Sequence, residues 1–282
     1  MPASIKDKIV ICVAQFDVKM FDRAHNLQKM TALACQAKKE YRPDLLIFPE
    51  CANCGYNFRS KEDVAAVSEP RDGYTVSYLR TLAMDLGCGL VFGFVERCGD
   101  DYFNCAAVIE STGKTHFYHK THLPFLGVDK YVVHGDCIQT IDTEFGPIGV
   151  MICYDLRFPE MARKLALQGA RLLVLPTNLP RGGEAHPNVF TKARACENRV
   201  YVVSCNRVGE ERGFCYIGRS QIVDPSGEVV GEMGENEGLM AAEIDLSLSE
   251  KKDMVVIPGE YETHFFADRR TSLYGIGGQE PN

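Results

Sequence analysis

The sequence predicts a mixed α/β fold that forms a single domain over residues 1–282. Short apolar runs of strand length alternate with amphipathic helical segments along the whole chain, and hairpin turns are mixed with crossover helices. No Ser/Gly-rich linker, internal repeat or low-complexity tract interrupts this alternation. A chain of 282 residues is also long enough to bury a substantial core.

The elements follow in order from the positions of the apolar runs and turn residues. A strand over residues 8–16 leads to a helix over 26–39, in which Leu27, Met30 and Leu33 lie on one face. Further strands are expected at 45–48, 89–96, 104–110, 114–119, 138–142, 148–153, 171–175, 200–206, 220–223 and 228–231. Further helices are expected at 75–85, 160–168 and 190–198, and loops at 122–135 and 176–187.

The charge balance argues against a nucleic-acid partner. The formal net charge is −7, the pI is near 5.6, and the 31 Lys and Arg residues form no basic block. No run approaches the roughly 20 apolar residues that a membrane span needs. The apolar stretch near the start is interrupted by Gln15 and Asp17 and is too short for a secretory signal. We therefore expect a cytoplasmic protein with no membrane partner.

The twelve cysteines do not by themselves point to a disulfide or metal framework. Several lie inside apolar runs, where a thiol behaves as a small buried hydrophobic group. Disulfides are not expected in the absence of a secretion signal. Cys51 and Cys54 form a lone C-x-x-C pair with no second pair at zinc spacing, so no metal site is expected there.

Three expected strand ends carry reactive side chains. Glu50 follows the apolar run at 45–48, Lys120 follows the strand at 114–119, and Cys153 ends the strand at 148–153. In open α/β sheets, ligands bind in the crevice beyond the carboxyl ends of the strands. The three side chains are therefore expected to converge on one site.

Their chemistry is complementary. A thiol attacks a carbonyl only after losing its proton, and a buried Glu50 with a raised pKa suits that task. Lys120 is a compact positive charge that suits the oxyanion formed when Cys153 attacks, together with the backbone N–H that follows the nucleophile. Taken singly, each residue also has an ordinary explanation as a buried filler, a cap or a surface charge.

With these motifs the sequence resembles the nitrilase superfamily of carbon–nitrogen hydrolases. The motifs are F-P-E ending at Glu50, Y-x-K-x-H-L around Lys120, and C-Y-D-x-R-F-P-E beginning at Cys153. Further matches, in the family's order, lie at 55–56, 175–178, 194–198, 206–209, 224–227, 268–270 and 273–274. The likeness spans nearly the whole chain.

The resemblance implies a four-layer α-β-β-α sandwich with the active site at strand ends. It implies a catalytic triad in which Glu50 is the base, Lys120 the oxyanion partner and Cys153 the nucleophile, without a metal or organic cofactor. It also implies a homodimer or higher homo-oligomer paired through helical layers, with the C-terminal extension, residues 245–282, packing at a subunit interface.

One position departs from the family pattern. Many members carry a second glutamate in the loop after the lysine, and the matching carboxylate here is Asp129, one methylene shorter. Two alternatives stay open on the sequence alone. Asp129 either reaches Lys120 or pairs at the surface with its neighbour Lys130.

The residues after Cys153 favour amide over nitrile hydrolysis. Nitrilases usually carry Cys-Trp-Glu, whereas this chain has Cys-Tyr-Asp and no tryptophan, as in omega-amidases and N-carbamoyl amide hydrolases. The expected reaction is hydrolysis of a small carboxamide or N-carbamoyl amide through a thioester, with release of ammonia. Nitrile hydrolysis and acyl transfer remain alternatives. A silent interaction module of the same fold is disfavoured because all three triad residues are present.

Several further residues are candidates for supporting or substrate-binding roles. Arg157 suits a substrate carboxylate, but a structural pair with Asp155 or Glu160 is the alternative. The loop after residue 176 is expected to line the pocket because loops carry specificity. The complete set is Asp129 and Tyr154 as supporting residues, and Tyr56, Arg157, Asn178, Arg181 and His186 as substrate-binding residues.

Overall fold

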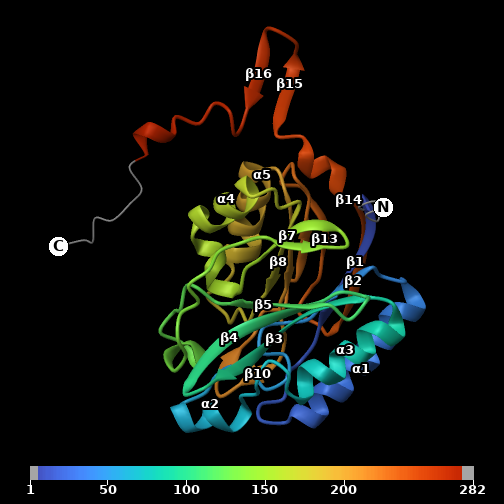
Figure 1. Cartoon of the computed structure of the whole chain (residues 1–282), viewed down its shortest axis with the longest axis vertical. Coiled ribbons are helices and arrows are strands. Elements are labelled where there is room, and N and C mark those ends of the chain that lie inside the picture. Colours follow the sequence, from blue (N-terminus) through green and yellow to red (C-terminus); the bar gives the residue numbers. More distant parts are fainter. Residues whose placement is uncertain (1–5, 275–282) are drawn as a thin grey trace, which may run out of the picture.

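Two six-stranded sheets pack face to face, and helices cover the outer face of each (Figure 1). The structure is a computed structural model that describes residues 6–274. Helices α1 and α3 lie against one sheet, and α4 and α5 lie against the other. The expected α-β-β-α sandwich is confirmed.

The first sheet has the strand order β14-β1-β2-β3-β4-β5. Its strands are β1 (Lys8–Gln15), β2 (Leu45–Ile47), β3 (Gly89–Cys98), β4 (Asp101–Ile109), β5 (Thr115–His119) and β14 (Gly238–Asp245). Alternate side chains point to opposite faces, so Leu45 and Ile47 enter the core between the sheets while Leu46 packs beneath the helices. Both faces are buried, which explains why these strands are nearly continuous apolar runs.

The second sheet has the order β13-β12-β9-β8-β7-β6 and is parallel at its centre, from β7 to β9. Its strands are β6 (Ile141–Thr143), β7 (Gly146–Val150), β8 (Leu172–Pro176), β9 (Tyr201–Cys205), β12 (Gln221–Val223) and β13 (Val229–Glu232). The carboxyl ends of the three central strands therefore lie at the same edge of this sheet.

The α-helices between residues 6 and 274 are α1 (Arg23–Glu40), α2 (Lys61–Val67), α3 (Tyr74–Leu86), α4 (Pro159–Leu167) and α5 (Thr191–Asn198). A side chain caps the start of α1 and of α2. The Asp22 carboxylate accepts a hydrogen bond from the N–H of His25 at the start of α1, and Ser60 caps α2 in the same way. Gly87 ends α3 in the left-handed conformation with φ 55°.

Several expectations about the elements were wrong or incomplete. Helix α2 and the strands at 210–211, 214–215, 253–257 and 261–264 were not predicted. Strand β7 ends at Val150, so Cys153 does not end a strand but begins the 3₁₀ turn η2 (Cys153–Arg157). Strand β14, at an edge of the first sheet, was not predicted; its residues are only partly buried, so its apolar signal is weak. The helix expected from residue 190 is preceded by a π-helical turn, η3 (His186–Phe190).

The C-terminal segment projects from the body as the hairpin β15 (Asp253–Ile257) and β16 (Tyr261–His264) (Figure 1). Its apolar side chains are exposed: Val255 and Val256 are 52% and 53% exposed, and Ile257 is 49% exposed. Residues 275–282 of the expected C-terminal extension lie outside the described residues.

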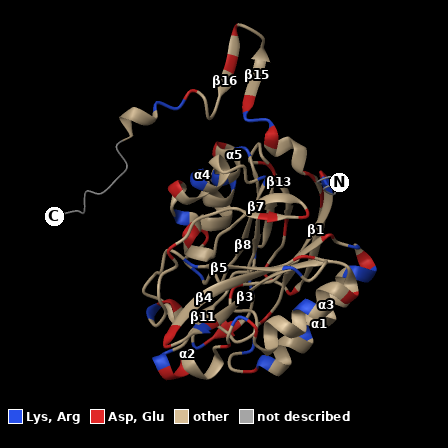
Figure 2. Ribbon diagram, viewed as in Figure 1, with Lys and Arg blue, Asp and Glu red and all other residues tan. Residues whose placement is uncertain are grey.

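Lys and Arg are interspersed with Asp and Glu over the ribbon, and no continuous basic stripe is seen in this view (Figure 2). Between residues 6 and 274, no helix has both the length and the apolar character needed to cross a bilayer.

Candidate active site

Glu50 and Lys120 follow β2 and β5 of the first sheet and meet across the two strands that lie between them. Both side chains are fully buried, and the Lys120 ammonium donates to Glu50 Oε1 at 2.8 Å. Glu50 approaches closely because Gly93 on β3 has no side chain; a Cβ there would lie 2.4 Å from the Cys51 nitrogen and 2.6 Å from Glu50 Cα. The glycine therefore allows the chain after β2 to cross β3.

Asp129 completes a buried ion cluster around Lys120. It lies in the 3₁₀ turn η1 (Gly127–Lys130), and its Oδ2 accepts from the Lys120 ammonium at 2.6 Å and from the Tyr56 hydroxyl at 2.6 Å. Asp129 is 4% exposed, so it is not a surface partner of Lys130. Of the two alternatives left open by the sequence, the structure shows the contact with Lys120.

Cys153 is held at a strained turn beyond β7. Its φ of 46° is in the left-handed region, which a side chain with a Cβ rarely adopts. Burial and the nearby Glu50 raise the pKa of the thiol to about 12, against opposing effects of Lys120 and Thr177. The thiol is therefore protonated near neutral pH, and attack requires a group that removes the proton.

Glu50 and Lys120 both have a raised pKa, with different consequences for their charge. Burial raises the pKa of Glu50, and the charge of Asp129 adds to that increase while Lys120 opposes it. For Lys120, burial favours the neutral amine, but the carboxylates of Asp129 and Glu50 outweigh burial and raise its pKa well above the usual value. Glu50 is thus suited to proton transfer, and Lys120 remains a cation.

Asp155 links the turn that begins at Cys153 to the residues on either side of Lys120. This fully buried carboxylate accepts hydrogen bonds from the Tyr118 hydroxyl at 2.8 Å, the Ile152 N–H at 2.9 Å and the His122 N–H at 3.0 Å. No such role was expected for Asp155. The available signal in the sequence was an aspartate two residues after Cys153.

Two buried asparagines, Asn104 and Asn178, form hydrogen bonds with residues of the site. The sequence did not predict a role for Asn104, and it predicted a different contact for Asn178. Asn104 on β4 donates to both Glu50 and Asp129, and no role was expected for it. Asn178, expected to contact substrate, donates through Nδ2 to the Glu50 carbonyl at 2.9 Å. The signal for Asn104 was a polar residue at the start of an otherwise apolar strand.

The other candidate residues occupy different positions around this cluster. The guanidinium of Arg157 lies 5.9 Å from the Tyr154 ring and 5.4 Å from the Phe190 ring. Within residues 6–274 it forms no ion pair with either carboxylate proposed as its structural partner. The side chain of Arg181 is exposed, and it does not join the buried cluster.

His186 is buried at the start of η3, and its pKa is lowered to about 4 by burial and by the charges of Arg157 and Lys120. Four buried polar atoms at these residues have no hydrogen-bond partner within the described chain. They are Glu50 Oε2, Thr177 Oγ1, Asn178 Oδ1 and His186 Nδ1. Because buried polar groups are nearly always satisfied, these atoms indicate where a ligand or water binds.

A narrow crevice adjoins the site but leaves no room for a water molecule. Its lining is largely aromatic and apolar and consists of Tyr56, Asn57, Leu126, Asn178, Pro180, Phe214 and Tyr216.

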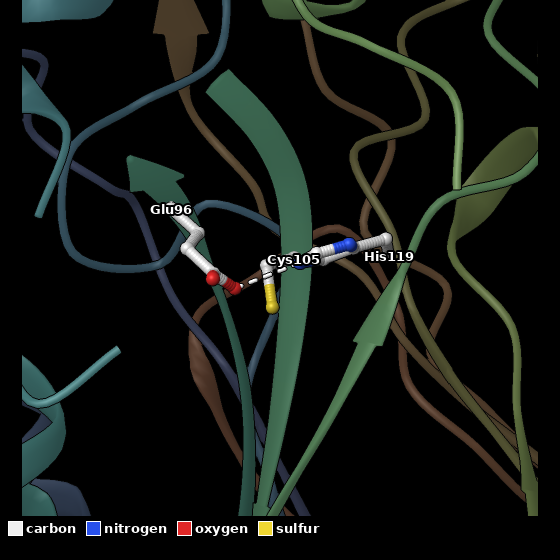
Figure 3. A group of neighbouring side chains, drawn as sticks. All are labelled: Glu96, Cys105 and His119. Carbon is white, nitrogen blue, oxygen red and sulfur yellow. Dashed lines mark hydrogen bonds and ion pairs between the residues drawn. The ribbon is translucent and has the colours of Figure 1, made fainter. Parts of the chain in front are cut away.

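A second group of side chains has the donor types of a metal site. Glu96, Cys105 and His119 come together on adjacent strands of the first sheet (Figure 3). However, Glu96 already accepts from His119 at 2.8 Å and from the Arg71 guanidinium at 2.9 Å. The arginine supplies the positive charge that a metal would bring, so we interpret the group as a structural ion cluster.

Comparisons with known proteins agree with the geometry. Residues 11–252 match the family model described as carbon-nitrogen hydrolase. A nitrilase of Pyrococcus abyssi is 35% identical and covers 94% of this chain and 99% of its own. A 2-oxoglutaramate amidase of Bacillus subtilis is 30% identical, with 95% and 100% covered. The structure of an amidase mutant from Nesterenkonia sp. AN1, with an acetamide moiety added covalently at its active-site cysteine, is 26% identical, has a TM-score of 0.78 and covers 95% of each chain.

The buried ion cluster predicts a pH-dependent loss of stability in Lys120→Met. Two uncompensated buried carboxylates should cost about 3–5 kcal/mol of unfolding free energy. The pKa of Glu50, which Lys120 now lowers, should rise further, so the folded variant holds a proton that the unfolded chain releases. Its stability should therefore fall as the pH rises from about 5 to about 8.

Urea denaturation of Lys120→Met at both pH values measures this effect. The exposed Lys39→Met is the matched control and should show little change. An equal loss of stability in the two lysine variants, or a loss in Lys120→Met that does not depend on pH, would contradict the ion cluster.

Proposed function

The chain belongs to the carbon–nitrogen hydrolase family, and we propose that it is an amidase that cleaves a small carboxamide or N-carbamoyl amide at Cys153. The observation that carries this proposal is the buried ion cluster of Lys120 with Glu50 and Asp129 beside a buried thiol. Desolvation of a lysine and two carboxylates is costly, so such a cluster is typical of a functional site.

In the proposed reaction, Cys153 Sγ bonds to the carbonyl carbon as its proton passes to Glu50. Oε2 of Glu50 suits this transfer because it has no hydrogen-bond partner among residues 6–274. The negative charge on the substrate oxygen is stabilised by the Lys120 ammonium and by the N–H of Tyr154. The C–N bond then breaks, and the proton on Glu50 leaves with ammonia.

The second half of the reaction releases the acid. Glu50 removes a proton from a water molecule, and the resulting hydroxide attacks the carbonyl carbon of the Cys153 thioester. The C–S bond breaks, and the thiol regains a proton from Glu50. Lys120 stabilises the oxyanion in both halves and keeps its charge throughout, in keeping with its raised pKa.

The amide substrate is favoured by Cys153-Tyr154-Asp155 and by the relative named 2-oxoglutaramate amidase. Nitrile hydrolysis is the alternative, because another relative is named a nitrilase. Interception of the thioester by an amine would make the protein an acyl transferase. A silent module of the same fold would show no turnover on any substrate.

We further propose that Arg157 binds a carboxylate at the far end of the substrate. It is an exposed guanidinium without a carboxylate partner among residues 6–274, and it lies beside the rings of Tyr154 and Phe190. The neutral His186 lies close enough to Arg157 for that charge to lower its pKa, and its free Nδ1 suits a second polar contact.

We also propose that the C-terminal hairpin packs against a second copy of the chain. An isolated two-stranded hairpin is marginally stable in water, and the apolar side chains of β15 are exposed. The segment after β16 is anchored to its own body by cation–π contacts of Arg163 and Lys252 with Phe266. Strands β15 and β16 project from the body and are therefore available to a partner subunit.

Ammonia release from a panel of small amides, N-carbamoyl amino acids and nitriles tests the reaction. Cys153→Ala should abolish release, and Glu50→Gln should reduce it by at least about 100-fold, because general-base catalysis contributes that much. The buried Cys54→Ser is the control and should keep activity. Activity retained in Cys153→Ala would overturn the assignment, and release from nitriles alone would favour the alternative. Product analysis with added amine separates hydrolysis from acyl transfer.

The carboxylate proposal predicts a selective effect of Arg157→Met. For amides with a distal carboxylate, kcat/KM should fall about 10- to 100-fold, because a charge-assisted hydrogen bond is lost. For neutral amides, kcat/KM should change little. Arg181→Met, at an exposed arginine on the neighbouring loop, should leave both unchanged. An equal loss on neutral and carboxylated amides would indicate that Arg157 is structural.

The hairpin proposal predicts that Val255→Asp combined with Ile257→Asp gives a smaller assembly. The pairing of β15 with β16 shifts register between Val255 and Ile257, so their partners Glu262 and Tyr261 are consecutive residues. The two charges therefore lie on opposite faces of the hairpin, and each face would oppose burial against a partner. Sedimentation velocity should show a lower mass than for the unchanged chain. An unchanged mass, or a monomeric unchanged chain, would contradict the proposal.

A further inference from the structure

Asn104 lies at the centre of the site although it has no reactive group. It is on β4, 1% exposed, and between the two carboxylates that bind Lys120. We propose that Asn104 is a positioning residue that locks one oxygen of Glu50 and leaves the other free for proton transfer with Cys153. This inference rests on the proposed amidase function.

The four side chains form a closed ring of hydrogen bonds. Asn104 Nδ2 donates to Glu50 Oε1 at 2.7 Å and to Asp129 Oδ1 at 2.8 Å. Lys120 Nζ donates to the same Glu50 oxygen at 2.8 Å and to Asp129 Oδ2 at 2.6 Å. Three of the four carboxylate oxygens are thus occupied, and the fourth is Glu50 Oε2.

The orientation of the Asn104 amide is set by its surroundings. Its Oδ1 faces the Cys51 thiol, which donates over 3.9 Å. A reversed amide would place Oδ1 against two carboxylate oxygens, which repel it. The Asn104 carbonyl also accepts from the Lys120 N–H at 2.9 Å, so one residue of β4 fixes the backbone of the lysine and both of its partners.

The ring also affects the charge of Glu50. The cluster holds two carboxylates and one ammonium, and burial raises the pKa of Glu50, with a further increase from Asp129. The hydrogen bonds from Lys120 and Asn104 act in the opposite direction and lower that pKa. Asn104 therefore favours the ionised carboxylate that the reaction requires as a base.

Other titratable groups surround Glu50 and set the background for this effect. They are Lys120 after β5, Asp129 in η1, Cys51 and Tyr56 after β2, Cys153 in η2 and Tyr216 after β11 (Phe214–Cys215). A substitution at Asn104 also removes the hydrogen bonds of its amide with Asp129 and Cys51. A shift in the pH profile therefore reports on the altered ring around Glu50.

Asn104→Leu and Asn104→Asp test the proposal, with Asn26→Leu and Asn26→Asp as controls. Asn26 is a fully buried asparagine whose Nδ2 donates to two carbonyls, but it lies in α1, away from the ion cluster. For each folded variant, kcat and KM for ammonia release are measured across pH. The rate of Cys153 alkylation by iodoacetamide is measured over the same range, and thermal unfolding reports stability.

Both Asn104 variants should lower kcat near pH 7 by about 10- to 100-fold with little change in KM, because a hydrogen bond to a charged group is lost. The loss of N–H donors raises the pKa of Glu50, so the acid limb of the activity and alkylation profiles should move to higher pH. A shift of at least about one pH unit is expected, and it should be larger for Asn104→Asp, which adds a negative charge. The Asn26 variants should lose stability without any shift.

Unchanged acid limbs in folded Asn104 variants, with the same loss of stability as the controls, would overturn the inference and leave the amidase function intact. Failure of the proposed function gives a different result. In that case the unchanged protein releases no ammonia and Cys153→Ala behaves as the unchanged protein does.

Discussion

The ion cluster around Lys120 is the constraint on which the rest of the site depends. A lysine and two carboxylates are held without exposure to solvent, so each charge must be neutralised and hydrogen-bonded at close range. That demand explains the rigid supports nearby. Glu50 and Lys120 follow strands of one sheet, and Asp129 sits in a short helical turn that Tyr56 anchors.

The supports couple the two sheets of the sandwich. Asp155, from the turn that begins at Cys153 beyond the second sheet, accepts hydrogen bonds from Tyr118 and His122 on either side of the lysine. The thiol and the ammonium are therefore fixed relative to each other by a carboxylate that takes no part in the proposed reaction. Gly93 has a similar supporting role, because its missing side chain lets the loop of Glu50 cross β3.

This arrangement separates the protonation states of the three reactive groups. Burial is the main cause of the raised pKa of Glu50 and of the raised pKa of the Cys153 thiol. Only at Lys120 do the neighbours outweigh burial, because two carboxylates raise its pKa and keep it charged. In the proposed reaction these states give a proton acceptor, a fixed cation and a nucleophile from one group of buried side chains.

The sequence by itself predicted a mixed α/β fold, because apolar runs and turn residues are local features. Its motifs and their family resemblance singled out Glu50, Lys120 and Cys153, although Cys153 lies in a turn and not at a strand end. Only the tertiary structure decided that Asp129 binds Lys120, that Arg157 has no carboxylate partner among residues 6–274, and that Cys153 begins a strained turn. Asn104 and Asp155 were missed for the same reason. Their roles come from contacts with residues 25 to 54 positions away, which depend on strand order and register, and those are set by packing of the whole chain.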